Sequence, residues 1–257
     1  MSPSPTGQLV SRSGASQACV PKRSLGTRWG IIALIVTATV RGQDPSPERI
    51  RYLRPVGDKF ATECDFVISR DADGWNILSR TGRMEVEARY DKEDRLTSAK
   101  ATLSDGKSTK VATVKIKDGR ATVERAGAEP STFDVPKGTI VTSAPDWSDV
   151  FLLCRRYDRA KKGKQEFPAL WIHPEKPARR LTFSIEPQGI DPLKHDGIKI
   201  ELTRYLIKIR DGSAYASWAD GDGRMIRLIP LPVKNTAFGM TLEGYEKSEA
   251  GLTPPER

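Results

Sequence analysis

Aromatic and basic side chains gather in one segment of the sequence in a pattern that could bind a ligand. Trp147 and Phe151 are one helical turn apart, and Arg155 and Arg156 follow them. Ligand cavities are mostly apolar with a few polar groups, and basic residues beside such a cavity could meet a lipid head group. The simpler alternatives are core packing for the rings and a solvated helix end for the arginines. We expect the ligand-binding residues to be Trp147, Phe151, Trp171, Trp218, Arg155 and Arg156.

Residue types suited to catalysis are sparse. The sequence has two histidines, His173 and His195, and no Gly-x-Ser-x-Gly nucleophile motif. Cys154 falls on an apolar helix face with no histidine nearby in the sequence. Because two histidines are too few for a zinc site, we expect neither a catalytic residue nor a metal. Carboxylates from distant segments could still meet in space and form a catalytic pair.

Two short motifs resemble cofactor or ion loops but lack the residues that complete them. Gly106-Lys107-Ser108 resembles the end of a phosphate-binding loop, yet Ala101 stands where that motif needs glycine. The segments 71–74 and 220–223 resemble fragments of calcium loops, but neither has a glutamate at the twelfth position. We therefore expect hairpin turns at all three places and no cofactor.

The N-terminal segment has the layout of an export signal. A polar stretch is followed by the basic residues Lys22, Arg23 and Arg28 and by an apolar run over residues 29–40. This run of twelve residues is shorter than the roughly twenty that a membrane-spanning helix needs. We expect residues 1–42 to be a signal peptide that is removed, and the protein to be periplasmic or secreted.

The positive charge of the chain is concentrated in this first segment. Five of the 42 basic residues lie within residues 1–42, which contain no acid, so the remainder carries 37 bases against 33 acids. The formal charge therefore falls from +9 for the whole chain to +4 for the rest. Since acidic residues are interspersed throughout, we expect no nucleic-acid partner. Peripheral contact with a membrane stays open.

Cys64 and Cys154 remain after removal of residues 1–42. An even number of cysteines in an oxidising compartment permits a disulfide, but nothing in their spacing requires one. We favour two separately buried thiols, because Cys154 lies on an apolar helix face.

Alternation of apolar and polar residues dominates the sequence from residue 59 onward and predicts β-strands. Asp-Gly dipeptides, favoured in tight hairpins, separate the alternating segments, so consecutive strands should pair antiparallel. About ten strands are expected between Lys59 and Leu231. Within residues 198–209 the apolar phase shifts, which indicates a bulge or a bend near Thr203-Arg204. The clearest strands are residues 84–90, 112–116 and 181–185, and the turns are Asp73-Gly74, Asp105-Gly106, Asp118-Gly119, Asp211-Gly212 and Asp222-Gly223.

One segment has helical periodicity instead. Apolar residues recur at helical spacing from Trp147 to Tyr157, after Ser143 and Pro145 in positions suited to cap and start a helix. We expect an amphipathic helix over residues 146–158 that lies against the sheet. The predicted organisation is a signal peptide (1–42), an N-terminal extension (43–58), a curved antiparallel sheet domain (59–235) and a polar C-terminal tail (236–257).

The order of these elements resembles a family. Several hairpins precede the segment Pro145-Asp146-Trp147-Ser148-Asp149-Val150-Phe151-Leu152-Leu153-Cys154-Arg155, a basic hairpin contains Gly163, and long strands end in Tyr215-Ala216-Ser217-Trp218-Ala219-Asp220. Over residues 59–231 this resembles uncharacterised periplasmic proteins of unknown function that look related to the lipoprotein localisation factors. The resemblance implies a mainly β fold, a strongly curved antiparallel sheet or half-open β-barrel with the helix packed on its concave side. In the localisation factors that concavity receives lipid acyl chains.

Three functions follow as expectations. The first is an exported, non-enzymatic binding or carrier module for an apolar or amphiphilic ligand, held between the helix and the concave sheet. The second is an envelope protein-interaction domain whose core is fully packed, and the third is an enzyme acting on envelope polymer. An open or a filled concave side separates the first two.

Overall fold

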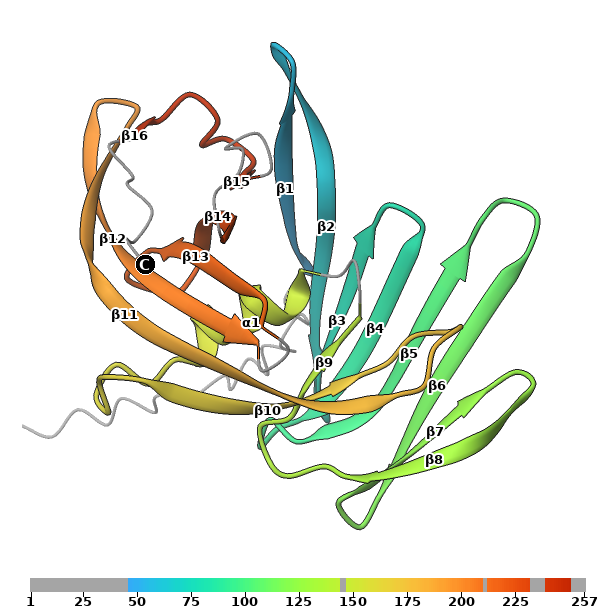
Figure 1. Ribbon diagram of the computed structural model, residues 1–257. Coiled ribbons are helices and arrows are strands. Elements are labelled where there is room, and N and C mark those ends of the chain that lie inside the picture. Colours follow the sequence, from blue (N-terminus) through green and yellow to red (C-terminus); the bar gives the residue numbers. More distant parts are fainter. Residues whose placement is uncertain (1–45, 144–146, 210–211, 232–238, 251–257) are drawn as a thin grey trace, which may run out of the picture. The chain divides into compact units, whose positions relative to one another are not determined.

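The computed structural model describes residues 46–143, 147–209, 212–231 and 239–250 (Figure 1). The chain divides into two units between Gly42 and Gln43, and every described residue belongs to the second unit. The expected signal peptide lies outside the described residues. Within the part described, no helix is long and apolar enough to span a membrane.

The described chain is mainly β, with one helix and one large sheet, as the alternating pattern predicts. The helix is α1 (Ser148–Arg156). The strands of the sheet are β1 (Glu48–Val56), β2 (Lys59–Asp71), β3 (Gly74–Thr81), β4 (Met84–Asp91), β5 (Leu96–Ser104), β6 (Thr109–Lys117), β7 (Arg120–Arg125), β8 (Ala128–Asp134), β9 (Ile140–Thr142), β10 (Gln165–Trp171), β11 (Arg179–His195), β12 (Ile198–Ile209), β13 (Ala214–Ala219), β14 (Met225–Leu231), β15 (Met240–Leu242) and β16 (Glu249–Ala250).

The sheet joins two runs of hairpins through one late strand. Its order is β8-β7-β6-β5-β4-β3-β2-β1-β15-β14-β13-β12-β11-β10-β9, and β16 pairs with β11. All pairs are antiparallel except β9 with β10. Figure 1 shows the sheet curling around α1, so that β2 and β13 lie on different sides of the helix. The predicted curved antiparallel sheet with a helix on its concave side is confirmed.

The hairpin connections at Asp73-Gly74, Asp105-Gly106, Asp118-Gly119 and Asp222-Gly223 form as expected, each with its glycine at positive φ, whereas Asp211 of the fifth predicted turn lies outside the described residues. Asp118 and Gly119 have φ of 52° and 72° and connect β6 to β7 as a two-residue turn. Asp196-Gly197, which was not among the predicted turns, connects β11 to β12 in the same way, with φ of 47° and 79°.

The sheet is wider than predicted. Residues 43–58, expected as an extension, contain β1, which pairs with both β2 and β15. Residues 236–257, expected as a tail, contain β15 and β16. Thirteen strands, not ten, lie between Lys59 and Leu231. β15 and β16 have three and two residues, too few to show alternation, and are held by long-range pairing. β1, by contrast, has nine residues and buries the alternate residues Ile50 and Tyr52.

The helix is shorter than predicted. It begins at Ser148, Trp147 is its N-cap residue, and no side chain caps it. Residues 144–146, including Pro145, lie outside the described residues. The first turn is stabilised by Asp149, whose carboxylate accepts hydrogen bonds from the Thr142 hydroxyl and the Val150 amide, both at 2.6 Å. At the other end, Tyr157 is extended with ψ of 119°, which stops the helix two residues early.

The expected irregularity near Thr203-Arg204 lies in the partner strand. β12 pairs with β13 without interruption there, whereas β11 has an extra residue between Pro187 and Gly189. In β12 the buried residue changes from Leu202 on one face to Tyr205 on the other. The apolar phase therefore shifts because the two ends of β12 bury opposite faces, and not because β12 is bulged.

The two described cysteines are separate buried thiols, as favoured from the sequence. The Cys154 Sγ lies 3.3 Å from the Ser217 hydroxyl, and Cys64 contacts the sulfur of Met240 at 3.9 Å. Burial raises the pKa of Cys154 to about 12.

Candidate functional site

Side chains of α1 occupy the concave side of the sheet. Residues 148–154 are all buried, and the Phe151 ring lies 5.5 Å from that of Phe66 on β2. On the opposite side, Tyr157 contacts Tyr205 of β12 with ring centroids 5.0 Å apart. The space where a ligand was expected, between the helix and the sheet, therefore holds protein side chains. This is the packed arrangement that the interaction-domain alternative described.

A cleft of about 330 Å³ opens at the C-terminal end of α1. Its apolar wall is formed by Ile68, Trp75 and Leu152, from β2, β3 and α1. Its basic groups are Arg70, Arg155 and Arg156. We call these six residues, with Asp94 and Asp222, the helix-end cleft.

Arg156 is held in a fixed position at this cleft. Its guanidinium lies 4.7 Å from the ring centroid of Tyr90 and 5.7 Å from that of Trp75, and these two rings stack at 4.3 Å. Its Nη1 donates a hydrogen bond of 3.1 Å to the carbonyl of Gly138. Its Nη2 is buried and has no hydrogen-bond partner among the described residues. A guanidinium held by aromatic faces is orientated for bidentate recognition of an anion.

The other charges of the helix-end cleft leave it basic. Arg155 lies 4.9 Å above the Phe151 ring and forms an ion pair of 2.9 Å with Glu48. Arg70 has no ion pair or hydrogen bond among the described residues. The Asp94 carboxylate accepts a hydrogen bond of 2.8 Å from the Trp75 indole. With three arginines against Asp94 and Asp222, the lining carries a formal charge of +1.

The predicted binding residues do not form one site. Phe151, Arg155 and Arg156 come together at the end of α1. Trp147 lies at its other end, edge-on to Tyr215 at 5.6 Å. Trp171 and Trp218 lie in two further places.

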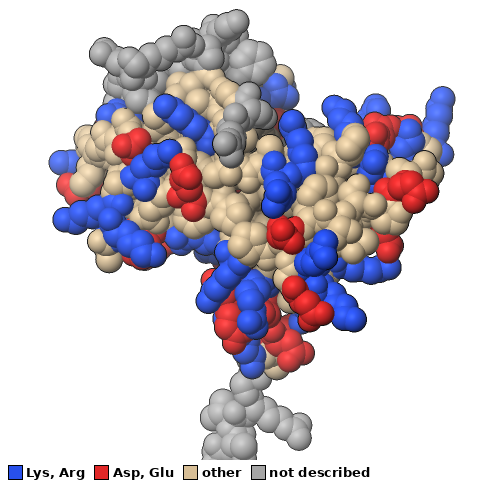
Figure 2. Space-filling view, turned by 60° about the horizontal axis from the view of Figure 1, so that its bottom comes forward, with Lys and Arg blue, Asp and Glu red and all other residues tan. Residues whose placement is uncertain are grey.

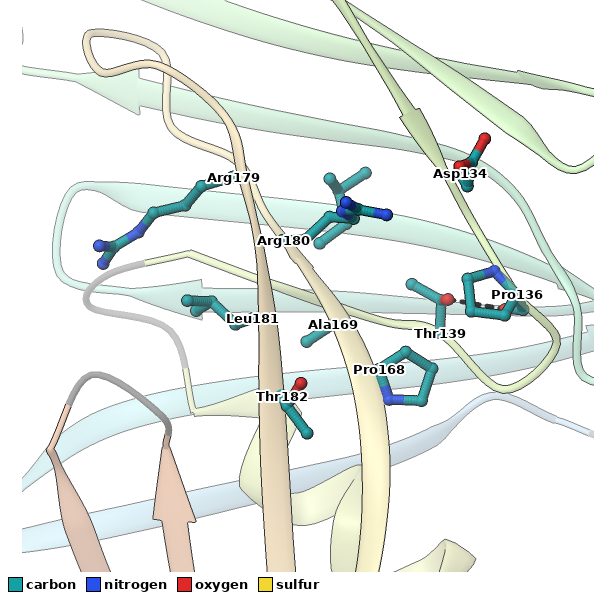
Figure 3. Close-up of a pocket in the computed structure, with 10 residues that line it drawn as sticks. Asp134, Pro136, Thr139, Pro168, Ala169, Arg179, Arg180, Leu181 and Thr182 are labelled. Atoms are coloured by element: carbon teal, nitrogen blue, oxygen red, sulfur yellow. Dashed lines mark hydrogen bonds between the residues drawn. The ribbon is translucent and has the colours of Figure 1, made fainter.

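Trp171 stands beside a groove of about 610 Å³ (Figure 3). The groove runs between Asp134–Thr139 on one side and strands β10 and β11 on the other. Figure 3 shows Arg179 and Arg180 pointing in different directions from β11. Arg179 covers the Trp171 ring at 5.0 Å, and that ring stacks on His173. Arg180 is exposed and makes no bond to a described residue, so of the two arginines in this groove only Arg179 is held in place.

Trp218 is fully buried on the face of β13 that is turned away from the helix. Its indole donates a hydrogen bond of 2.7 Å to Asp191. Packing is the role that this geometry supports for Trp218.

Trp75 and Asp94 belong to the helix-end cleft, and Tyr90 supports Arg156 beside it, although their spacing in the sequence gives no such signal. Pairing of β3 with β4 places Trp75 opposite Tyr90, and the turn after β4 brings Asp94 to the indole. Among the described residues, no group of three or more potential metal ligands comes together.

Charged residues are mixed over the surface. On the face shown in Figure 2, Lys and Arg alternate with Asp and Glu, with uncharged surface between them.

No family model matches the sequence, and no curated protein matches it. Solved structures do align. A β-barrel-like protein of the domain of unknown function DUF1849 from Brucella abortus has 12% identity and a TM-score of 0.47, over 76% of this chain and 94% of that one. A DUF1089 family protein from Pseudomonas aeruginosa has 16% identity and a TM-score of 0.39, over 79% and 95%. The hypothetical lipoprotein YmcC from Escherichia coli has 12% identity and a TM-score of 0.31, over 76% and 86%.

Proposed function

We propose that this protein is an exported, non-enzymatic binding module of the cell envelope that holds the anionic head of an amphiphile in the helix-end cleft. The observation that carries the proposal is the Arg156 guanidinium, fixed on two aromatic rings with one buried nitrogen left without a partner. A buried donor without an acceptor costs stability, and an anionic ligand oxygen would supply the acceptor.

The shape of the cleft limits what can bind. At about 330 Å³ it matches the lower end of small-molecule sites. The wall of Ile68, Trp75 and Leu152 would accommodate the first carbons of an apolar chain, while Arg155 and Arg156 hold the head group. The remainder of a long chain would extend beyond the cleft, because α1 fills the concave side. Binding of the head region therefore fits the geometry better than enclosure of a whole acyl chain.

Titration with dodecyl phosphate, below its micelle concentration, tests the proposal. The comparison ligand is dodecyl maltoside, which has the same chain and an uncharged head. We expect saturable binding of the phosphate only, and at least about tenfold weaker binding by Arg156→Gln, the loss of a charge-assisted hydrogen bond. Arg180→Gln, which removes an exposed arginine from the other groove, is the matched control and should bind as the unaltered protein does.

Two outcomes would overturn this function. Equal binding of both ligands would show that charge plays no part, and unchanged affinity in Arg156→Gln would place the ligand elsewhere. Circular dichroism of Arg156→Gln should show an intact sheet, and Arg156→Lys, which keeps the charge without the planar fork, should fall between the two.

Export is tested separately by the mature N-terminus. A basic segment before a short apolar run motivates the expectation that residues 1–42 are removed. Sequencing of protein recovered from the envelope should begin near Gln43, and an intact Met1 would contradict it.

A protein-interaction role has its own supporting observation. Val56 and Phe60, on either side of the β1–β2 turn and on opposite faces of that hairpin, are 50% and 46% exposed. Crosslinking to an envelope protein that is lost in a Val56→Ser, Phe60→Ser double variant, together with no binding of dodecyl phosphate, would favour this function.

A further inference from the structure

The face of the sheet turned away from α1 has a second core. Residues directly opposite in an antiparallel pair share a face, so Arg204, Trp218, Arg227 and Thr241 form one row across β12, β13, β14 and β15. Trp218 in this row is fully buried, as are Leu202 and Leu193 from the far ends of β12 and β11. The long strands β11 and β12 and the segment after β15 thus cover a face that would otherwise meet solvent.

The two arginines that flank Trp218 differ in their surroundings. Arg204 lies 3.3 Å from the carboxylate of Asp191, which also accepts the Trp218 indole hydrogen bond. Arg227 has no ion pair and no hydrogen bond among the described residues. Burial alone lowers the pKa of Arg227. Residues 232–238, which follow β14, include no acidic residue that could pair with it.

Arg227 is half-buried, and a partly desolvated guanidinium without a counter-charge is less favourable than a paired one. Beside Arg227 is a cavity of about 140 Å³. Leu193, Ile226, Phe60 and Tyr245 supply apolar walls, and Thr241 and Ser248 supply hydroxyl groups. A cavity of about 150 Å³ holds a molecule the size of benzene. Glu246 also lines the cavity, where its carboxylate accepts a hydrogen bond from the Gly244 amide.

We propose that this cavity is a second binding site, for a small monocarboxylate with an apolar body, and that Arg227 binds the carboxylate. The geometry supplies one cation, one carboxylate from Glu246 that is held by the Gly244 amide, hydroxyl groups and apolar walls around a volume that fits a single ring or a short chain. The ligand carboxylate would provide the counter-charge that Asp191 provides for Arg204. This site is separate from the helix-end cleft and does not depend on the function proposed there.

Titration of the full chain with benzoate, followed by calorimetry, tests this site. Benzyl alcohol is the matched ligand without charge. We expect saturable binding of benzoate, at least tenfold weaker binding of benzyl alcohol, and loss of benzoate binding in Arg227→Met. Arg156→Gln should bind benzoate as the unaltered protein does, which separates this site from the helix-end cleft.

A stability comparison distinguishes a binding arginine from a structural one. Without ligand, Arg227→Met should melt at about the same temperature as the unaltered protein, because it removes a half-buried charge that has no partner among the described residues. Arg204→Met should melt lower, because it leaves Asp191 unpaired. Benzoate should raise the melting temperature of the unaltered protein and of Arg156→Gln, but not that of Arg227→Met. Absence of saturable benzoate binding, unchanged binding in Arg227→Met, or a large loss of stability in that variant would each overturn the proposal.

Discussion

The strands β12, β13 and β14 are buried on both faces, by two different means. On one face α1 supplies a continuous apolar surface. The polar contact described there is between two small neutral groups, the Cys154 thiol and the Ser217 hydroxyl. The other face is covered by strand ends and by the C-terminal segment. The row of residues across this face contains Arg204 and Arg227 with Trp218 between them.

This difference indicates where a ligand can be accommodated. A helix is one preformed unit, so its side chains can fill a curved sheet to native density. Cover assembled from several separate chain segments fits less closely, and it leaves a cavity of about 140 Å³ beside Arg227. The helix leaves space only where it ends, at the helix-end cleft.

The largest expected effect comes from breaking the helix face. Phe151 is fully buried against Phe66, so Phe151→Ala should lower the free energy of unfolding by about 3–5 kcal/mol. Urea denaturation would measure it. Phe60→Ala, which truncates a ring that is 46% exposed, should cost much less. Equal losses in the two variants would mean that Phe151 does not pack as described.

The second core should respond to loss of its carboxylate. Asp191→Ala leaves the Trp218 indole and Arg204 without their shared acceptor, and should cost about 2–3 kcal/mol. Asp191→Asn keeps an oxygen for the indole and removes the charge, so its loss should be intermediate. If both variants melt like the unaltered protein, Asp191 does not stabilise Arg204, and the contrast between a paired Arg204 and an unpaired Arg227 does not hold.

A close approach joins the turn after β13 to the end of α1. Gly223 has φ of +77°, and a Cβ there would lie 2.8 Å from the Cys154 carbonyl oxygen. Gly223→Ala should therefore cost more than the about 1–2 kcal/mol of a left-handed residue alone. Gly212, with φ of +99° and open space around it, provides the control. Similar losses of stability for the two alanine variants in thermal melts would show that the end of α1 moves to make room for the added Cβ.

The smallest effect is chemical and depends on pH. Burial raises the pKa of Cys154 to about 12, so the thiol should not react with a thiol reagent at pH 8 until the protein unfolds. An unfolded thiol ionises near pH 8.5, so the neutral folded form contributes stability below that pH and loses it as pH rises toward 12. Reagent titration with and without guanidinium chloride measures this. Rapid labelling of the folded protein would contradict a helix face closed to solvent.

Local sequence patterns predicted the hairpins and the helix, because alternation and helical spacing act over a few residues. Met84, Val86 and Ala88 alternate with charged residues and are all buried, as expected. The face change in β12 was interpreted as a bulge or a bend, because the pattern shows where apolar residues stop but not that a second core begins. Arg227 gave no signal, since an arginine in an alternating strand is ordinarily a solvent-facing residue.

The candidate site was predicted less completely than the fold. Arg155 and Arg156 were selected from their place after an aromatic helix face, and both line the helix-end cleft. The rings that hold Arg156 come from Trp75 and Tyr90, which are remote in sequence from the helix. Such contacts depend on sheet curvature, which no local pattern specifies.

The position of β15 between β14 and β1 has a consequence for how the chain is made. Tyr52 and Leu242 are partners across this junction, so the first strand of the sheet completes its pairing with one of the last. The two halves of the sheet therefore cannot join until synthesis has passed residue 242, although the hairpins within each half pair over short sequence separations and can form earlier. A ribosome-bound fragment that ends after β14 would leave β1 with one edge unpaired.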